Sequence, residues 1–240
     1  MIEIEHLAKS FGKLEVLTDV NLTINKGETL VILGASGCGK SVLLKLMMRL
    51  LRPDEGRILI DGKDINLLKR DELYFLRTRF GMLFQGAALF DSMNVFENVT
   101  LPMSEHTKAG EKEKRECAAR HLEMVGLPGI EKKFPSELSG GMRKRVGLAR
   151  AICLDPEFVL YDEPTTGLDP ISADKINDLI ISLTERLSIT SIAVTHDLYS
   201  AFKIGNRFAM LAGGVIRFVG SKEEIQASDD PVIQEFLSHQ

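Results

Sequence analysis

The sequence has few cysteines, no long apolar run and no excess of charge of one sign. Its three cysteines, Cys38, Cys117 and Cys153, are an odd number without paired spacing, which argues against a disulfide framework or zinc site and favours a reducing compartment. No run of about 18 apolar residues occurs, and no apolar core follows a basic start, so we expect neither a membrane-spanning helix nor a signal peptide. The formal net charge is −4 and basic residues are scattered among acidic ones, so no nucleic-acid-binding surface is expected.

The order of strand-like and helical patterns predicts an α/β fold. Short β-like runs separated by turn signals occupy residues 2–33, and the last run, at 29–33, is wholly apolar, as in a buried strand. Helical spacing of apolar residues replaces this pattern within 90–156. Strands and helices alternate again over 157–220, and 221–240 favours a short helical tail. We therefore expect a parallel sheet with crossover helices, preceded by antiparallel strands and interrupted by a helical subdomain.

A glycine-rich loop follows the apolar run at 29–33 and precedes an apolar helical pattern. Residues 34–41 fit G-x-x-x-x-G-K-[ST], and the strand–loop–helix context disfavours a glycine-rich turn that binds nothing. Backbone N–H groups and the helix N-terminus would surround phosphate oxygens, Lys40 would reach the terminal phosphates, and the Ser41 hydroxyl would ligate Mg²⁺. The candidate nucleotide-binding residues here are Gly34, Ala35, Ser36, Gly37, Cys38, Gly39, Lys40, Ser41 and Val42.

A second apolar run, at 158–161, ends in the two acids Asp162 and Glu163. Open α/β sheets bind ligands at the carboxyl ends of their strands, which is where both carboxylates would emerge. Asp162 is a candidate for the Mg²⁺ shell, and Glu163 is a candidate general base that polarises the attacking water. In isolation, a solvated Asp-Glu turn before Pro164 would be the simpler interpretation, and the phosphate loop is what favours the catalytic one.

Residues 138–146, Leu-Ser-Gly-Gly-Met-Arg-Lys-Arg-Val, resemble the signature segment of the ABC ATPases. The remaining motifs of that family follow in the correct order, and the resemblance covers the chain from Phe11 to His196. Phe11 matches the aromatic that stacks on adenine, Gln85 the Q-loop, Gly167-Leu168-Asp169 the D-loop, and His196 the switch histidine.

The resemblance implies a P-loop NTPase with a RecA-like parallel sheet core and ATP and Mg²⁺ as cofactors. It implies one ABC ATPase domain over 1–240, with the nucleotide-binding core at 1–89 and 157–220, the helical subdomain at 90–156 and the tail at 221–240. Ser139, Gly140 and Gly141 would contact the ATP held by an opposite subunit, so that two sites form in a head-to-tail homodimer. The implied catalytic residues are Lys40, Gln85, Glu163 and His196; the metal ligands are Ser41, Gln85 and Asp162; Phe11 and Asp169 complete the nucleotide contacts.

Within the family, the chain is most similar to the Mla-type ATPases that move phospholipids between bacterial membranes. Met142 after the signature glycines, Val42 and the segment after Gln85 carry this likeness. It implies integral-membrane permease subunits, an MCE-domain lipid carrier and a small regulatory subunit as partners, at the cytoplasmic face of the bacterial inner membrane. Five apolar residues are candidates for permease docking, although each fits the subdomain core equally well: Ala87, Ala88, Leu89, Phe90 and Met93.

Three other functions remain open from the sequence. The chain could energise another importer or serve a soluble machine such as the iron–sulfur cluster scaffold ATPase, although the Arg-Ala form of 143–151 favours a transporter. A nucleotide-locked module without turnover is disfavoured because Glu163 and His196 are both present.

Overall fold

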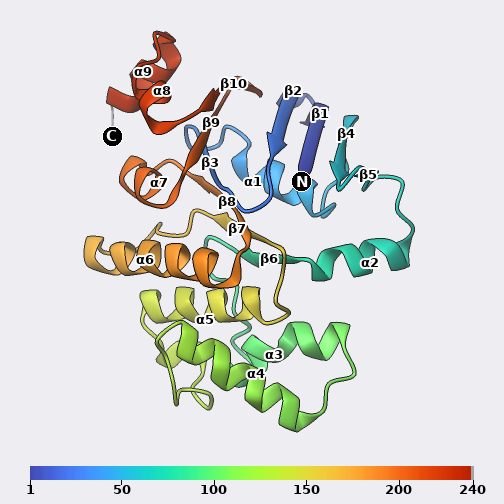
Figure 1. The fold of residues 1–240 in the computed structure, drawn as a ribbon, viewed down its shortest axis with the longest axis vertical. Coiled ribbons are helices and arrows are strands. Elements are labelled where there is room, and N and C mark those ends of the chain that lie inside the picture. Colours follow the sequence, from blue (N-terminus) through green and yellow to red (C-terminus); the bar gives the residue numbers. More distant parts are fainter. Residues whose placement is uncertain (239–240) are drawn as a thin grey trace. The chain divides into compact units, whose positions relative to one another are not determined.

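The computed structural model describes residues 1–238 and divides into two compact units. The first unit contains Met1–Phe75 and the described residues from Thr190 onward, and the second contains Leu76–Ile189. Figure 1 labels the helices and strands of both units. The boundaries of these units differ from those expected for the helical subdomain, 90–156. That subdomain therefore stays a prediction.

The antiparallel strands of the first unit come from the N-terminal part of the chain. β1 (Ile2–Phe11) pairs with β2 (Leu14–Ile24) on one side and with β4 (Glu55–Ile60) on the other, and β4 pairs with the short β5 (Lys63–Asp64). Ile2, Ile4 and Leu7 of β1 are buried, because alternate side chains of a strand point to the same face.

The parallel strands of the first unit carry the phosphate loop. β3 (Thr29–Leu33) pairs in parallel with β8 (Thr190–Thr195) and with β9 (Arg207–Ala212), and every residue of β3 and β8 is buried. β9 turns at Gly213 and Gly214, both with positive φ, into the antiparallel β10 (Val215–Gly220). The predicted buried strand at 29–33 is therefore confirmed.

Four helices belong wholly to the first unit, and α2 (Arg70–Thr78) runs across the boundary. α1 (Lys40–Met47) directly follows the phosphate loop, and α7 (Leu198–Ile204) contacts β3 and β8. The tail forms α8 (Lys222–Gln226) and α9 (Pro231–Ser238), which contact each other. The two short helices α2 and α7 have no counterpart in the sequence-based prediction.

The second unit contains two parallel strands and most of the long helices. β6 (Phe80–Leu83) pairs with β7 (Phe158–Asp162), and between them in the chain lie α3 (Val95–His106), α4 (Glu111–Met124), the 3₁₀ turn η1 (Pro135–Glu137) and α5 (Gly140–Ile152). α6 (Pro170–Leu187) follows β7. α5 contacts α3, α4, α6 and β6 (Figure 1). Gly81 permits the close approach of β6 to α5, since a Cβ at this position would overlap the carbonyl oxygen of Ala151 in α5.

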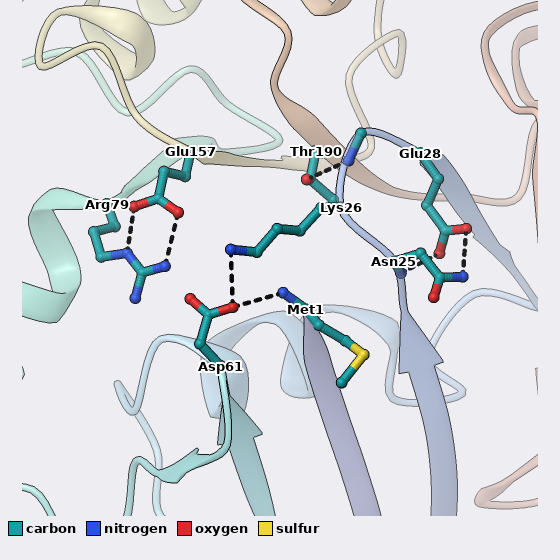
Figure 2. Close-up of polar contacts among 9 residues, drawn as sticks. Met1, Asn25, Lys26, Glu28, Asp61, Arg79, Glu157 and Thr190 are labelled. Carbon is teal, nitrogen blue, oxygen red and sulfur yellow. Dashed lines mark hydrogen bonds and ion pairs between the residues drawn. The ribbon is translucent and has the colours of Figure 1, made fainter.

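Charged side chains fix the loops at one end of the strands within each unit (Figure 2). In the second unit the Arg79 guanidinium donates two hydrogen bonds of 2.7 Å to the Glu157 carboxylate. In the first unit the Asp61 carboxylate lies 2.9 Å from the Met1 ammonium group and 3.1 Å from Lys26 Nζ. The Gly27 N–H donates to Thr190 Oγ1 at 2.9 Å, which ties the turn before β3 to the start of β8.

No helix within residues 1–238 is both long enough and apolar enough to cross a membrane.

Candidate functional site

The phosphate loop begins where β3 ends and closes on the first turn of α1. Gly34, Gly39 and Lys40 are buried, whereas Ala35, Ser36 and Gly37 are exposed. Gly39 caps α1 in the left-handed region, with φ of 107°, a conformation that favours glycine. Cys38, Ser41 and Val42 are half-buried. The loop therefore presents an open run of backbone at a helix N-terminus, which is the arrangement that binds anions.

Lys40 holds this loop together from inside. Its ammonium group donates to the carbonyl oxygens of Gly34 at 2.7 Å and Ala35 at 3.1 Å, and only 5% of the residue is exposed. A buried ammonium group needs such partners because desolvation of an unpaired charge is costly. The positive charge of Lys40 consequently lies at the centre of the loop.

A cavity of about 520 Å³ adjoins the loop within the first unit. Ala35, Ser36, Cys38 and His196 line it. His196 comes there because Leu33 and Thr195 are paired in β3 and β8, so that Gly34 and His196 are the next residues of adjacent parallel strands. The other lining residues come from β9 and its turn and from α9: Met210, Leu211, Ala212, Gly213, Val232, Glu235 and Phe236. The pairing of β3 with β8 brings Gly34 and His196 to one sheet edge. The sequence gave no sign that α9 also borders this cavity.

Phe11 lies at the end of β1 with 46% of its surface exposed. The Lys9 ammonium group is 5.5 Å from the centre of its ring. An exposed aromatic face at this position is available for stacking, and this is the property for which Phe11 was singled out.

The two acids and Gln85 lie at the carboxyl ends of the two strands of the second unit. Leu83 of β6 is paired with Tyr161 of β7, so Gln85 and Glu163 are each two residues beyond a matched pair. Asp162 and Glu163 are buried, at 6% and 7% exposure, whereas Gln85 is exposed. The two carboxylates therefore lie at the carboxyl ends of the strands, as expected, and Gln85 lies at the same ends within this unit.

Glu163 has an unusual backbone conformation. Its φ of 48° lies in the left-handed region, which non-glycine residues rarely adopt and which is enriched at functional sites. Thr166 supports it twice, with its hydroxyl 3.2 Å from Glu163 Oε2 and its N–H donating to the Glu163 carbonyl oxygen at 3.3 Å. The sequence analysis did not single out Thr166.

The signature segment forms the N-terminus of α5. Ser139 is the N-cap, and its hydroxyl oxygen accepts a hydrogen bond from the Met142 N–H at 3.3 Å. Ser139 is exposed and the two glycines are half-buried. A Cβ placed on Gly140 would lie 3.4 Å from Leu168 Cδ2, so the backbone of Gly140 packs closely against the segment that precedes α6. The N-terminus of α5 carries the positive end of the helix dipole, which favours an anion.

Asp169 caps the next helix, α6, by accepting a hydrogen bond from the Ser172 N–H at 3.0 Å. Hydrogen bonding from Ser172 holds the pKa of the Asp169 carboxyl below its ordinary value. Asp169 is exposed, and it therefore carries a negative charge at the protein surface.

Two buried cations on α5, Lys144 and Arg150, escaped the sequence analysis. Lys144 Nζ donates to the carbonyl oxygen of Gln85 and to that of Glu163, the latter at 3.1 Å. Burial lowers the pKa of the Lys144 ammonium group to about 8, against the attraction of the Asp162 and Glu163 carboxylates. The sequence feature that could have identified both residues is a basic side chain on the apolar face of a predicted helix.

The five docking candidates divide by exposure. Ala87 is buried at 1%, in agreement with the core interpretation, whereas Ala88 is exposed and Phe90 is 51% exposed. Leu89 and Met93 are half-buried. The Asn98 side chain fixes the exposed turn by bonding the N–H of Phe90 at 2.8 Å and its carbonyl oxygen at 3.1 Å.

The family model described as ABC transporter matches residues 17–166. The chain belongs to the ABC transporter family. It is 47% identical over 237 residues to the probable ribonucleotide transport ATP-binding protein mkl of Mycobacterium tuberculosis, with 99% of this chain covered. It spans 66% of that relative's length. It is 43% identical to the intermembrane phospholipid transport system ATP-binding protein MlaF of Haemophilus influenzae, covering 99% of this chain and 90% of the relative. The MlaF protein of Escherichia coli is 39% identical, with 99% and 88% covered.

Solved structures of ABC cassettes share the fold. The dimeric post-hydrolysis structure of the ATP-binding cassette MJ0796, bound to ADP and Pi, matches with a TM-score of 0.84 and 34% identity, covering 92% of this chain and 98% of that one. The cbiO1 protein of Clostridium perfringens, part of the ABC transporter complex cbiONQ, matches with a TM-score of 0.85 and 30% identity over 98% and 93% of the two chains. The predicted α/β fold of an ABC ATPase and the resemblance to the Mla type are both confirmed.

Proposed function

We propose that this chain is the ATP-binding and ATP-hydrolysing subunit of an ABC transporter. The observation that carries the proposal is the presence of two anion-receptive helix N-termini, at α1 and α5, in a chain of the ABC transporter family. Such N-termini turn backbone N–H groups and the positive end of the helix dipole toward phosphate oxygens. In phosphoryl transfer, positioning and charge stabilisation of this kind supply most of the catalysis.

Each predicted site residue then has a defined role. The backbone of 34–42 and the Lys40 ammonium group hold the phosphates, and Phe11 stacks on the adenine. Glu163 accepts the proton of the attacking water, and Gln85 aligns this water with the terminal phosphate. His196 forms a hydrogen bond with the terminal phosphate. Ser139, Gly140, Gly141 and Asp169 face the nucleotide of a second copy, so that hydrolysis requires a homodimer.

Mg²⁺ suits the donor set of Ser41, Gln85 and Asp162, which offers only oxygen atoms. In residues 1–238 there is no group of three or more His, Cys, Asp or Glu side chains that could hold a metal ion alone. Mg²⁺ commonly takes one or two carboxylates and completes its shell with substrate phosphates and water. Bound in this way, the ion neutralises negative charge on the phosphate oxygens.

The cargo we propose is phospholipid. The two groups of relatives have names with different cargoes, ribonucleotide for the mycobacterial protein and phospholipid for MlaF. The identity of 43% over 237 residues to the phospholipid transport protein MlaF of Haemophilus influenzae, with the Mla-like segment after Gln85, supports the lipid. The exposed Ala88 and Phe90 then form the docking surface for a permease. The subunit would act at the cytoplasmic face of a bacterial inner membrane, with a lipid carrier as a further partner.

Replacing Glu163 by Gln tests the catalytic assignment. We expect Lys40, Mg²⁺ and the loop backbone to keep their contacts, so that ATP binding remains, while hydrolysis slows by about 10²–10⁴-fold, the usual share of a general base. Turnover is measured by phosphate release and binding by titration with a fluorescent ATP analogue. Glu116→Gln on the exposed side of α4 is the matched control and should keep the wild-type rate. An unchanged rate in Glu163→Gln would refute the role of this residue.

Purification from native membranes in mild detergent tests the transporter and its cargo. We expect an integral-membrane permease in stoichiometric amount, together with lipid-binding companions and co-purifying phospholipid. A permease with bound nucleotide would favour the ribonucleotide function, and soluble partners alone would favour an assembly machine such as the iron–sulfur scaffold.

A further inference from the structure

One face of α5 lies against the loop that follows β6. Lys144, Gly147 and Arg150 follow one another at intervals of three residues and therefore share a face of the helix. A Cβ on Gly147 would come within 2.9 Å of Leu83 Cδ1 and 3.3 Å of Ala87 Cβ. The absent side chain at Gly147 is thus what lets the helix approach the loop, with a cation on each side of the point of contact.

Lys144 connects two segments that are far apart in the sequence. Its ammonium group donates both to the carbonyl oxygen of Gln85, 59 residues earlier, and to that of Glu163, 19 residues later. Only 5% of Lys144 is exposed. The ammonium group therefore joins the backbone that follows β6 to the backbone that follows β7. The two residues it joins are Gln85, the proposed Mg²⁺ ligand, and Glu163, the proposed general base.

Arg150 acts on the same loop three residues further on. Its guanidinium donates to the carbonyl oxygens of Ala87 at 2.6 Å and Ala88 at 2.7 Å. Both alanines have positive φ, 61° and 47°, a conformation that persists only where the surroundings enforce it. Arg150 is 8% exposed, so these bonds are shielded from water.

We propose that Lys144 is a positioning residue that ties the Gln85 carbonyl group to the Glu163 carbonyl group, so that the loop 85–88 and the general base move as one. Arg150 completes the arrangement by fixing the loop at Ala87 and Ala88. Because Ala88 lies on the exposed side of this loop, displacement there would reach Glu163 through Lys144. The catalytic consequence rests on the proposed function, whereas the structural link does not.

Hydrogen exchange tests the link without any turnover. The Ala87 N–H bonds the Phe84 carbonyl oxygen at 2.8 Å, and the Thr166 N–H bonds the Glu163 carbonyl oxygen at 3.3 Å, so each segment has an amide that reports its order. In Lys144→Met we expect faster exchange in both 84–91 and 162–168, measured by mass spectrometry on the full-length chain. Lys112→Met, which alters a residue with a 90% exposed side chain on α4, should leave both segments unchanged. Faster exchange in one segment only, or in neither, overturns the proposal.

Turnover then tests the positioning role. We expect kcat of Lys144→Met to fall by about 10- to 100-fold, the cost of a displacement near 1 Å, while the affinity for ATP stays within about threefold. Lys144→Arg keeps a charged donor that can bond both carbonyl oxygens, and it should recover most of the rate. If Lys144 only filled space, restoring the charged donor would not restore the rate. If Lys144→Met does not fold, Lys144→Gln replaces it in both measurements. A wild-type chain without turnover would count against the proposed function, and the exchange result would still decide the link.

Discussion

The Sγ atoms of Cys117 on α4 and Cys153 at the end of α5 lie 3.2 Å apart. Hydrogen bonding from Cys153 and from His121 lowers the pKa of the Cys117 thiol to about 5, whereas the bond to Cys117 and burial raise the pKa of Cys153. A thiolate beside a second thiol is the reactive form in sulfur oxidation. A cavity of about 380 Å³, lined by Met103, Arg120 and both cysteines, offers a path to the pair.

We therefore predict that hydrogen peroxide joins these two cysteines. The Cys117 thiolate attacks the peroxide, the O–O bond breaks, and a sulfenic acid and hydroxide form; the hydroxide takes up a proton from solvent to become water. The Cys153 thiol then attacks the sulfenic sulfur, and the S–S bond forms as a second water leaves. Intact mass should fall by two hydrogens, and denaturing alkylation should label only Cys38. Cys153→Ser, which lacks the resolving thiol, should instead show added oxygen at Cys117. Three alkylated cysteines after full peroxide treatment would contradict the prediction.

The thiol of Cys38 reports occupancy of the phosphate loop. Cys38 is half-buried and lines the cavity beside Ala35 and His196, whereas Cys117 and Cys153 are 8% and 4% exposed. We expect N-ethylmaleimide to modify Cys38 first and to abolish ATP binding, because the added group fills the space beside the loop. Saturating Mg-ATP should slow the modification at least tenfold, and Cys38→Ser should bind ATP and resist the reagent. Equal modification rates with and without Mg-ATP would show that nucleotide does not cover this loop.

Gly34 tests how tightly the loop is packed. A Cβ at this position would overlap the carbonyl oxygen of Leu211 and lie 2.7 Å from Cys38 Sγ, and a backbone oxygen cannot move aside as a side chain can. We expect Gly34→Ala to lower the free energy of unfolding by about 1–3 kcal/mol, the usual cost of overpacking, and to weaken ATP binding more than tenfold. Gly86→Ala is the control, since a Cβ there meets nothing within 4 Å. Urea unfolding and titration with a fluorescent ATP analogue measure the two effects, and equal values for both variants would disprove the packing argument.

The candidate site could be predicted from the sequence where a motif adjoins a strand or a cap. Gly34 directly follows the wholly buried β3, Asp162 ends the wholly buried β7, and Ser139 caps α5, so each position could be read from neighbouring residues. Lys144 and Arg150 could not be assigned, because their partners are backbone carbonyls 59 and 62 residues away, and carbonyls leave no pattern in a sequence. The left-handed conformations of Ala87 and Ala88 are equally hidden, since neither residue favours positive φ.

The missed helices have a similar physical explanation. α2 has nine residues and buries only Leu76 among them, and α7 has seven residues. Neither provides the two or more turns of apolar spacing by which a helix is identified in a sequence. α7 forms because tertiary contacts support it, as its packing on β3 and β8 illustrates.

Asp54 should make the stability of the first unit depend on acid pH. Its carboxylate accepts hydrogen bonds from Lys9 Nζ at 2.7 Å and from the Ser10 N–H at 2.6 Å, and these two bonds, that of Lys9 first, lower the pKa of Asp54 in the folded chain. A lowered folded pKa means that the unfolded chain binds the proton more readily. The stabilising contribution is thus fully present above the ordinary value of 3.8 and is lost as the pH falls through the lower, folded value.

We expect the free energy of unfolding, measured in urea from pH 6 downward, to fall less steeply below 3.8 in Asp54→Asn than in the wild-type chain. Asp229→Asn removes the same charge from an exposed position of the same unit and should follow the wild-type curve. If Asp54→Asn and Asp229→Asn show the same slope, the two bonds to the Asp54 carboxylate do not favour its ionised form, and the antiparallel strands owe their stability at acid pH to other groups.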